Sequence, residues 1–454
     1  MAFHSHVAVL AFPFGTHAAP LFALVRRMAA SARGTLFSFF TSPTSNVGFF
    51  NGPDEHENIC VRDVWDGTPE NEVFTGSHSE AVGLFLKASP GNFEKAVEKA
   101  ESESGLKMEC LITDAFLWFG GDMAEERCVP WVAFWTAASC SLSAHVYTDE
   151  ILKVAGSTEE KTEQEQRLTF IPGLENARLA DLPPEIFLDV DNPSPLALTI
   201  GNMVRNLPKS SAIVLNSFDE IDPAITADLR RKFRHFLNVG PTTLLTSPND
   251  TTADPTECLP WLDQFRDTPK SVVYVSFGTV AVPPEPELRA LARALEALRA
   301  PFLWSLNDGA KNALPEGFVG RTAGGFGRIV PWAPQPRVLG HGSVGAFVTH
   351  CGWNSILESI AGRVPMVCRP FFGDQRLNGR MVEDTWRIGV GVPGGVFGED
   401  GSTAEVLGRV LSDEGMRENV GRLREKALEA VGPDGSSSRN FEKLLEVIRS
   451  RERD

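Results

Sequence analysis

Short apolar runs typical of strands and stretches with apolar residues at helical spacing follow each other along this chain. Short runs rich in β-branched and aromatic residues, such as HVAVLAF and GTLFSFFTS, predict buried strands. Between these two runs, Leu21, Leu24, Val25 and Met28 recur at helical spacing. The start of the chain therefore predicts a strand, a helix and a second strand. Such a unit implies a parallel sheet with helices on its faces.

The same alternation continues to residue 370 and divides into two series. The first series adds the strand candidates MECLITD, PWVAFWT and SAIVLNSF, and the second contains SVVYVSFGT, PFLWSLN, GAFVTH and VPMVCRP. Between them, residues 240–260 read GPTTLLTSPNDTTADPTECLP, a composition rich in Thr, Pro and Asp that is typical of a linker. We therefore predict an α/β protein with two doubly wound domains facing a cleft.

Composition and charge narrow the classes of function. A chain of 454 residues exceeds the size of one hydrophobic core. Its formal net charge of -16 argues against nucleic acid and anionic membranes as general partners. The N-terminal apolar run stops at Pro13, too short for a membrane span. The seven scattered cysteines include no C-x-x-C pair and indicate reduced thiols, so we expect a cytoplasmic protein.

Polar residues follow several predicted strands, on the edge where ligands bind in open α/β sheets. These residues are His17, Asp114, Thr136, Thr279 and His350. The histidine of FVTHCGWNS, His350, stands beside Cys351, which raises the possibilities of a thiol nucleophile and a metal site. A catalytic Cys-His pair more often joins residues that are distant in sequence. The stretch also fits a helix start near a phosphate, because Ser355 and Glu358 have the spacing of a capping box.

The segment around this stretch carries a family resemblance. Residues 332–375 read WAPQPRVLGHGSVGAFVTHCGWNSILESIAGRVPMVCRPFFGDQ, and they resemble the signature box of plant family 1 UDP-glycosyltransferases. FPFGTHAAPL, DAFLWF, FWTA, VVYVSFGT, FFGDQRLNGRMVED and VGPDGSS resemble the flavonoid 3-O-glycosyltransferase branch. The resemblance implies a GT-B fold of two Rossmann-like domains. Its implied parts are an acceptor-binding domain at 1–240, a linker at 241–260, a UDP-sugar-binding domain at 261–435, and a C-terminal helix at 436–454 that packs back on the first domain.

The resemblance also implies roles for individual residues of the donor site. Trp332 would stack on uracil, with Ala333 and Gln335 close by, and Glu358 would bind the ribose hydroxyls. The diphosphate would contact Thr279, Ser305, His350, Asn354 and Ser355, and the sugar would contact Thr136, Trp353, Asp374 and Gln375. An adjacent carboxylate and carboxamide suit sugar hydroxyls, because one accepts hydrogen bonds and the other also donates them.

For the acceptor, His17 is the predicted general base, since imidazole titrates near neutral pH, and Asp114 would orient it. The residues expected to bind the acceptor are Phe14, Gly15, Ser79, Phe116, His145 and Phe372. Aromatic residues near strand ends are more often core than pocket, but as a group they suit a flat polyphenol. Ser79 stands where some relatives place a glutamine, which leaves the acceptor's hydroxylation pattern open.

The resulting prediction is an inverting transfer of a hexose from a UDP-sugar to the 3-hydroxyl of a flavonol or anthocyanidin. UDP-glucose is the expected donor, with UDP-rhamnose and UDP-galactose as alternatives. We expect no cofactor and no metal, and a monomer. The D-x-D of Asp189 and Asp191 suggests the metal site of another glycosyltransferase class, but its loop lacks a matching context. An oxidoreductase would need a G-x-G-x-x-G that is missing after the first strand, and a non-catalytic UDP-sugar-binding protein stays open.

Overall fold

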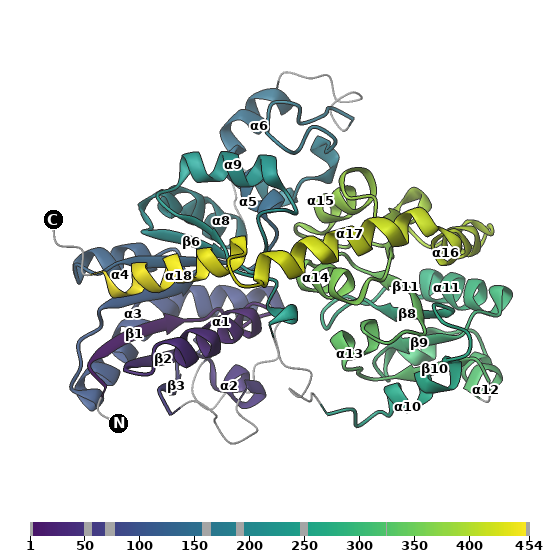
Figure 1. Cartoon of the computed structure of the whole chain (residues 1–454), viewed down its shortest axis with the longest axis horizontal. Helices are drawn as coiled ribbons and strands as arrows, with labels where there is room; N and C mark the ends of the chain where they lie inside the picture. The colour runs from purple at the N-terminus through teal and green to yellow at the C-terminus, as the bar shows by residue number, and fades with distance from the viewer. Residues whose placement is uncertain are drawn as a thin grey trace. The chain divides into compact units, whose positions relative to one another are not determined.

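The described part of the chain forms two compact units. The computed structural model describes residues 3–49, 57–68, 78–156, 165–187, 195–245, 253–323 and 325–450. The first unit comprises Met1–Thr148, Pro184–Thr242 and Gly432–Asp454, and the second comprises Asp149–Pro183 and Thr243–Val431. Each unit is built on one parallel sheet with helices packed against it (Figure 1).

The sheet of the first unit has seven parallel strands in the order β3-β2-β1-β4-β5-β6-β7. The strands are β1 (Ser5–Leu10), β2 (Thr35–Thr41), β3 (Ile59–Asp63), β4 (Cys110–Asp114), β5 (Trp131–Trp135), β6 (Ala212–Leu215) and β7 (Phe236–Asn238). β1 pairs with β4 although β2 and β3 lie between them in the chain. The strand order reverses there, and ligands of doubly wound sheets bind beyond the carboxyl ends of the strands at such a reversal.

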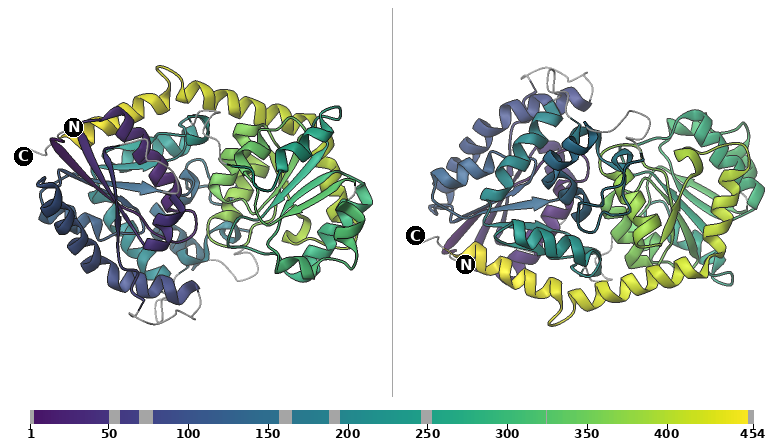
Figure 2. Two further views of the ribbon diagram at one scale, coloured as in Figure 1. Left: turned by 90° about the horizontal axis from the view of Figure 1, so that it is seen from below. Right: turned by 90° about the horizontal axis from the view of Figure 1, so that it is seen from above.

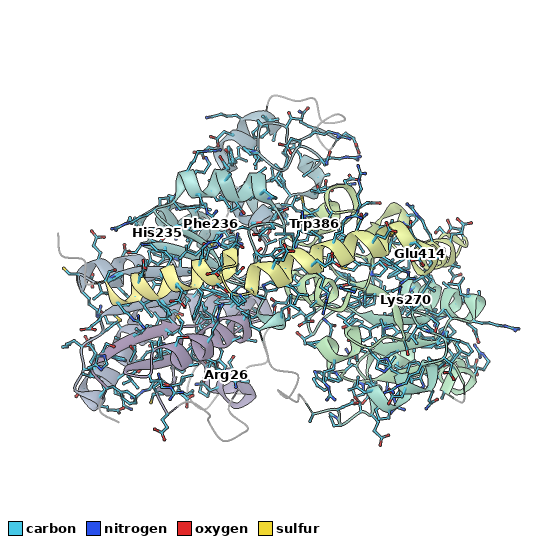
Figure 3. The ribbon with its side chains drawn as sticks, in the orientation of Figure 1. Arg26, His235, Phe236, Lys270, Trp386 and Glu414 are labelled. Atoms are coloured by element: carbon cyan, nitrogen blue, oxygen red, sulfur yellow. The ribbon has the colours of Figure 1, made fainter. Side chains whose placement is uncertain are left out.

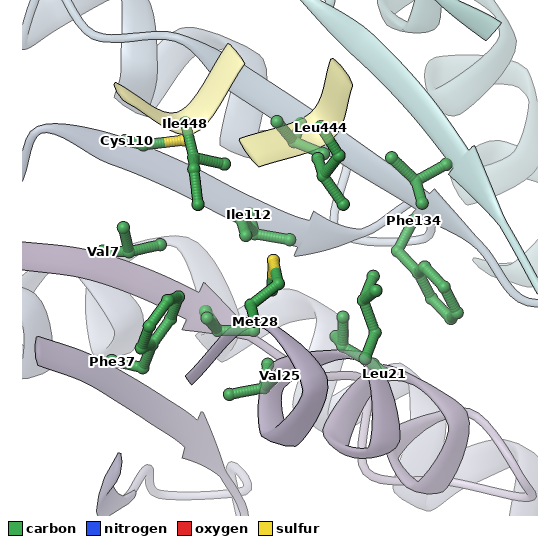
Figure 4. Close-up of a cluster of buried hydrophobic side chains, with 14 of the residues drawn as sticks. Val7, Leu21, Val25, Met28, Phe37, Cys110, Ile112, Phe134, Leu444 and Ile448 are labelled. Atoms are coloured by element: carbon green, nitrogen blue, oxygen red, sulfur yellow. The ribbon is translucent and has the colours of Figure 1, made fainter. Parts of the chain in front are cut away.

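Helices pack on this sheet through an alternating set of strand residues. They are α1 (Ala18–Ser31), α2 (Pro43–Phe49), α3 (His78–Ser104), α4 (Gly120–Glu126), α5 (Ser139–Val146), α8 (Pro195–Asn206), α9 (Pro223–Lys232) and α18 (Ser436–Arg449), with short turns η2 (Pro184–Ile186), η3 (Leu207–Lys209) and η4 (Thr242–Leu244). Every second residue of the central strands belongs to one core cluster with α1 and α18. In Figure 4, Met28 of α1 and Leu444 of α18 both point toward Ile112 of β4. This two-residue period explains the strand pattern in the sequence.

The C-terminal helix α18 belongs to the first unit and is fixed there by polar as well as apolar contacts. Ser437 Oγ donates to the carbonyl of Gly240 at 2.6 Å, and Asn440 Nδ2 donates to the carbonyl of Asn238 at 2.8 Å. The guanidinium of Arg27 lies 3.7 Å from the ring centroid of Phe441. Residues next to the predicted linker, far away in sequence, therefore anchor this helix.

The sheet of the second unit has six parallel strands in the order β10-β9-β8-β11-β12-β13. The strands are β8 (Val272–Ser276), β9 (Phe302–Ser305), β10 (Gly327–Val330), β11 (Val344–Thr349), β12 (Met366–Cys368) and β13 (Gly389–Gly391). As in the first unit, the order reverses at the first strand, between β8 and β11. The two views of Figure 2 show helices on both sides of this sheet.

The helices of the second unit complete its layers. They are α6 (Thr148–Ala155), α10 (Cys258–Leu262), α11 (Glu285–Leu298), α12 (Phe318–Ala323), α13 (Gln335–Leu339), α14 (Trp353–Gly362), α15 (Gln375–Arg380), α16 (Ser402–Ser412) and α17 (Glu414–Val431), with turns η1 (Leu179–Asp181), η5 (Asp263–Phe265), η6 (Ala310–Ala313), η7 (Met381–Thr385) and η8 (Pro393–Gly395). Side chains fill the space between the helices and the strands (Figure 3).

A single division of the chain near residue 240 does not describe the two units, because one earlier segment belongs to the second unit. Residues 149–183 belong to the second unit although both of their flanks belong to the first. An ion pair contributes to this grouping, because Arg380 Nε of α15 lies 3.0 Å from Asp181 Oδ2 of η1. The two residues are 199 positions apart, so no local pattern announces the contact.

Candidate active site

Three predicted residues of the first unit meet at the carboxyl ends of neighbouring strands. His17 follows β1 and is the N-cap of α1, Asp114 ends β4, and Thr136 follows β5. His17 Nδ1 lies 2.8 Å from Asp114 Oδ2 and 3.1 Å from Thr136 Oγ1. Since β4 pairs with both β1 and β5, the sheet order brings these side chains together.

The carboxylate determines which nitrogen of His17 is free. The side chain of Asp114 is only 1 % exposed, and its Oδ1 accepts a hydrogen bond from the backbone N–H of Phe116 at 2.9 Å. A carboxylate only accepts hydrogen bonds, so Nδ1 of His17 carries the hydrogen and Nε2 keeps its lone pair. The His17 side chain is 20 % exposed, in contrast to its partner. This arrangement fits the predicted role of His17 as a general base.

Thr136 contacts His17 of this pair. Its predicted role as a sugar ligand does not include this contact. Nδ1 has one hydrogen, and Asp114 Oδ2 is the nearer acceptor, so the Thr136 oxygen is a second and weaker acceptor. The contact to His17 therefore does not use the hydroxyl hydrogen of Thr136. That hydrogen can be donated to a ligand.

Aromatic rings surround His17. Its ring centroid lies 4.7 Å from that of Phe116 and 5.1 Å from that of Phe12. Phe12 also contacts Phe14, at 5.3 Å between centroids. Phe85 of α3 packs on both Phe12 and Phe14, at 5.7 and 5.5 Å. Phe85 was not predicted, because a buried phenylalanine within a helical pattern gives no signal of its place near a site.

The remaining predicted acceptor residues are placed as follows. Gly15 adopts φ +62°, a left-handed conformation that favours glycine, in the turn leading to His17. His145 of α5 is buried beside Trp135, and burial lowers its pKa to about 4, so its ring is neutral at pH 7. Phe372, in the second unit, is exposed. Ser79 lies in the first turn of α3, but its side chain lies outside the described residues.

In the second unit, most of the predicted donor residues follow strands of one sheet or begin the next helix. Ser305 ends β9, Thr279 and Trp332 follow β8 and β10, and His350 follows β11. Gln335, Trp353 and Gln375 are the first residues of α13, α14 and α15. In a parallel sheet these positions share the carboxyl edge, where helix N-termini can bind an anion.

A hydrogen-bonded network joins three of these residues and adds a fourth. Gln335 Nε2 donates to Glu358 Oε2 at 2.6 Å and to Ser355 Oγ at 3.0 Å. Gln335 Oε1 accepts from the hydroxyl of Tyr274 at 3.1 Å. Burial raises the pKa of Glu358 to about 7, and the amide of Gln335 opposes this shift in part. Tyr274 was missed by sequence reasoning, although it is the one polar ring in the apolar run VVYVS.

The predicted capping box is wrong. α14 begins at Trp353 with Gly352 as its N-cap, so Ser355 lies inside the first turn. The side chains of Ser355 and Glu358 pair with Gln335 instead of with the backbone of the helix end. Gly352 has the extended backbone of an N-cap, φ -62° and ψ 141°, so the N-cap lies three residues before the predicted one, Ser355.

The ring of His350 lies next to two glycines, Gly352 at the start of this helix and Gly278 after β8. A Cβ at Gly352 would lie 2.5 Å from His350 Nε2, and one at Gly278 would lie 3.1 Å from the same atom. Among the described residues, the buried Nδ1 of His350 has no hydrogen-bond partner. Burial lowers the pKa of His350 to about 4. The imidazole is therefore neutral at pH 7 and can offer a hydrogen bond, but no charge, to an anion at the helix N-terminus.

The neighbouring cysteine is not a nucleophile. Cys351 is fully buried, and its Sγ lies 3.9 Å from the carbonyl of Thr349. Burial, together with the adjacent Cys368, raises the pKa of the Cys351 thiol well above its ordinary value. Thiol chemistry needs the thiolate. The described residues contain no group of three or more His, Cys, Asp or Glu side chains arranged to hold a metal ion.

The two predicted tryptophans differ in exposure. Trp332 is 42 % exposed, and its carbonyl accepts a hydrogen bond from Thr256 Oγ1 at 3.1 Å. Its indole is thus available for stacking. Trp353 is 3 % exposed and packs against Trp386, with 6.1 Å between centroids (Trp386 is labelled in Figure 3). A ligand would meet Trp353 through its backbone, at the first position of α14.

Hydrogen bonds with nearby residues fix the side chains of Asp374 and Gln375. Gln375 Oε1 accepts from the backbone N–H groups of Phe371 and Phe372, at 2.9 and 3.3 Å. Asn378 Nδ2 donates to Asp374 Oδ2 at 2.8 Å and to the carbonyl of Cys351 at 3.0 Å. Asn378, which no local pattern in the sequence singles out, therefore links Asp374 to the segment FVTHCGWNS.

Two further expectations concern other parts of the chain. Asp189 and Asp191, the D-x-D, lie outside the described residues. Within the described residues, none of the helices is both long enough and apolar enough to cross a membrane.

Comparison with known proteins gives a consistent result. Residues 39–426 match the family model described as UDP-glucoronosyl and UDP-glucosyl transferase. The chain is 51 % identical to a flavonol 3-O-glucosyltransferase of Actinidia chinensis var. chinensis, over 98 % of this chain and 97 % of that protein. It is 53 % identical to an anthocyanidin 3-O-glucosyltransferase of Gentiana triflora, with 97 % of each chain covered.

Two further similarities concern the fold and a relative that transfers a different sugar. A crystal structure of a UDP-glucose:anthocyanidin 3-O-glucosyltransferase in complex with UDP superposes with a TM-score of 0.92, at 38 % identity and 99 % coverage of both chains. The predicted two-domain α/β fold is thereby confirmed. An anthocyanidin 3-O-galactosyltransferase of Actinidia chinensis var. chinensis is 48 % identical, over 98 % of this chain and 97 % of that one.

Proposed function

Because the chain belongs to the family of UDP-glucoronosyl and UDP-glucosyl transferases and has their GT-B fold, we propose that it transfers glucose from UDP-glucose to the 3-hydroxyl of a flavonol or anthocyanidin. The observation that carries the chemistry is the 2.8 Å contact between His17 and Asp114 among apolar aromatic rings. The similarity to a flavonol and to an anthocyanidin 3-O-glucosyltransferase supports the substrates.

The transfer is a single displacement. Nε2 of His17 takes the proton of the acceptor hydroxyl while that oxygen forms a bond to the anomeric carbon of the sugar. The bond from this carbon to the diphosphate oxygen breaks, UDP leaves with the electron pair, and the configuration inverts. The carboxylate of Asp114 stabilises the imidazolium that forms on His17.

The parts of the donor are assigned to separate groups of residues. Trp332 stacks on uracil beside Ala333, and Gln335 and Glu358 bind the ribose. The diphosphate is bound by Thr279, Ser305, His350, Asn354, Ser355 and the N-terminus of α14, and the sugar by Thr136, Trp353, Asp374 and Gln375. Charge that develops on the leaving diphosphate meets N–H donors at this helix end. On this scheme the reaction uses no cofactor and no metal.

The acceptor site is assigned chiefly to the first unit. Phe14 and Phe116 contribute flat apolar contacts, and Gly15 forms the turn that leads to His17. Ser79, His145 and Phe372 complete the proposed set. None of the seven cysteines is in a disulfide bond, which supports a reducing, cytoplasmic setting. Since a single chain carries the base and the donor residues, we take the active form to be a monomer.

The donor sugar and the catalytic role need separate experiments. UDP-glucose, UDP-galactose and UDP-rhamnose are compared with one flavonol and one anthocyanidin, and product mass and regiochemistry are determined. We expect the 3-O-glucoside as the main product. A 3-O-galactoside or 3-O-rhamnoside as the main product would reassign the donor, and a galactosyl-transferring relative makes that comparison necessary.

A non-catalytic UDP-sugar-binding protein is the second candidate, and His17→Ala distinguishes it. Loss of general base catalysis lowers kcat by roughly 100-fold to 10,000-fold, whereas the Kd for UDP should stay near the wild-type value. The control is His235→Ala, because His235 precedes β7 and so lies at the opposite, amino edge of the same sheet. Transfer at the wild-type rate by His17→Ala would contradict the mechanism, and a wild-type protein that binds UDP-glucose but forms no glycoside would favour the second candidate.

A further inference from the structure

A buried ion pair contacts the start of the segment that carries Asp374 and Gln375. Arg369 follows β12, and its Nε and Nη2 lie 2.7 and 2.6 Å from the two carboxylate oxygens of Glu287 in α11. The side chains are only 11 % and 8 % exposed. Two parallel hydrogen bonds between planar groups fix direction as well as distance.

The Glu287–Arg369 pair also contacts the main chain, at Phe397 and at Pro370. Glu287 Oε2 also accepts from the N–H of Phe397 at 3.1 Å, and Arg369 Nη1 donates to the carbonyl of Pro370. The guanidinium carbon of Arg369 lies 4.2 Å from the ring centroid of Phe371. Arg369 therefore orients the start of the segment 370–374 through its own main-chain neighbour and through the next aromatic ring.

The other end of this segment is held by one of the proposed sugar ligands. Gln375 uses its Oε1 to accept from the N–H groups of Phe371 and Phe372. A displacement of Phe371 would thus move the amide of Gln375 directly. Asp374, the residue before it, would move with the same turn.

A gain in stability is a weak explanation for such a pair. Desolvation of two charges offsets much of their attraction, and well-packed apolar residues often stabilise a buried position as well or better. What apolar residues cannot supply is a fixed orientation for Pro370 and Phe371. Glu287 fixes the guanidinium of Arg369, and Arg369 in turn contacts both Pro370 and Phe371.

We propose that Glu287 and Arg369 are positioning residues for the donor sugar, which hold the segment 370–374 so that Asp374 and Gln375 present their polar groups to the hexose. The inference rests on the proposed function, since it takes these two residues as sugar ligands. It predicts that the pair affects binding of the sugar part of the donor but not binding of the nucleotide part. The proposed nucleotide ligands Trp332, Gln335 and Glu358 belong to other elements.

The test is Arg369→Lys, with the Kd values for UDP and for UDP-glucose measured by titration calorimetry in the absence of acceptor. Lysine keeps the charge but loses the bidentate geometry and the contact to the Phe371 ring. We expect UDP-glucose binding to weaken about tenfold, a similar rise in KM for UDP-glucose, and a Kd for UDP within about twofold of wild type. Glu287→Gln, which keeps the shape of the side chain, should act in the same direction and replaces Arg369→Lys if that variant does not fold.

The matched control is Arg321→Lys. Arg321 of α12 also makes two bonds to one carboxylate, with Nε and Nη2 at 2.7 and 3.2 Å from Glu296, but this pair is exposed and lies on other elements of the same unit. It should change neither Kd. Equal weakening of UDP and UDP-glucose by Arg369→Lys, or no change in either, would overturn the inference. A wild-type protein that fails to bind UDP would instead overturn the proposed function.

Discussion

His17 Nδ1 lies 2.8 Å from Asp114 Oδ2, although 97 positions separate the two residues in the chain. The contact exists because β1 and β4 are neighbours in the sheet and both end at the same edge. It leaves Nε2 of His17 as the nitrogen that can accept a proton. This relationship makes the carboxylate as testable as the histidine.

Asp114→Asn should reduce transfer while preserving the fold. The amide can donate to Nδ1, which moves the ring hydrogen to Nε2 and removes the lone pair that takes the acceptor proton. We expect kcat to fall by roughly 100-fold or more, with little change in KM for UDP-glucose. Steady-state kinetics with one flavonol would check this. Wild-type kcat in this variant would show that the carboxylate does not orient the base.

Glu358 should make donor binding depend on pH. Burial raises its pKa from an ordinary 4.5 to about 7, and ribose hydroxyls donate to the carboxylate form. Below pH 7, binding must therefore release a proton, so affinity should fall by up to about tenfold per pH unit and level off above pH 7.

The test measures the Kd for UDP-glucose from about pH 5.5 to 8.5 in wild type and in Glu358→Gln. The glutamine variant should bind more weakly and lose this slope. The same raised pKa stabilises the unliganded fold most below pH 4.5, and that contribution is lost as pH rises through about 7. A wild-type Kd that is flat across this range would contradict the assignment of Glu358.

Gly352→Ala should weaken binding of the diphosphate. The added Cβ would lie 2.5 Å from Nε2 of His350 and must displace the ring or the start of α14. We expect the Kd for UDP to rise about tenfold. The control is Gly342→Ala, where no atom lies within 4 Å of the added Cβ. If both variants bind UDP as tightly as wild type, His350 and this helix end are not part of the donor site.

Local patterns in the sequence were sufficient for the fold class. The two-residue period of strands and the helical spacing of Leu21 to Met28 reflect which side chains face the core in the first unit. The strands of the second unit show the same two-residue period. The rule that ligands bind beyond strand ends singled out His17 and Asp114. The segment from Trp332 to Gln375 carried the family, because its residue types are specific over a long stretch.

Local patterns failed where the answer depended on a partner from elsewhere in the chain. Ser355 and Glu358 have capping-box spacing, but Gln335 binds both side chains, and α14 starts at Trp353. Tyr274 has the pattern of a core residue, and only packing shows its hydroxyl on Gln335.

The sequence by itself determined two parallel α/β units, the family and most of the candidate residues, because periodicity and motif are properties of neighbours along the chain. Only the tertiary structure decided the 2.8 Å contact between Asp114 and His17, the buried ion pair of Glu287 and Arg369, and the grouping of residues 149–183 with the second unit. Each of these depends on strand order and packing between distant elements, which hydrophobic spacing does not encode.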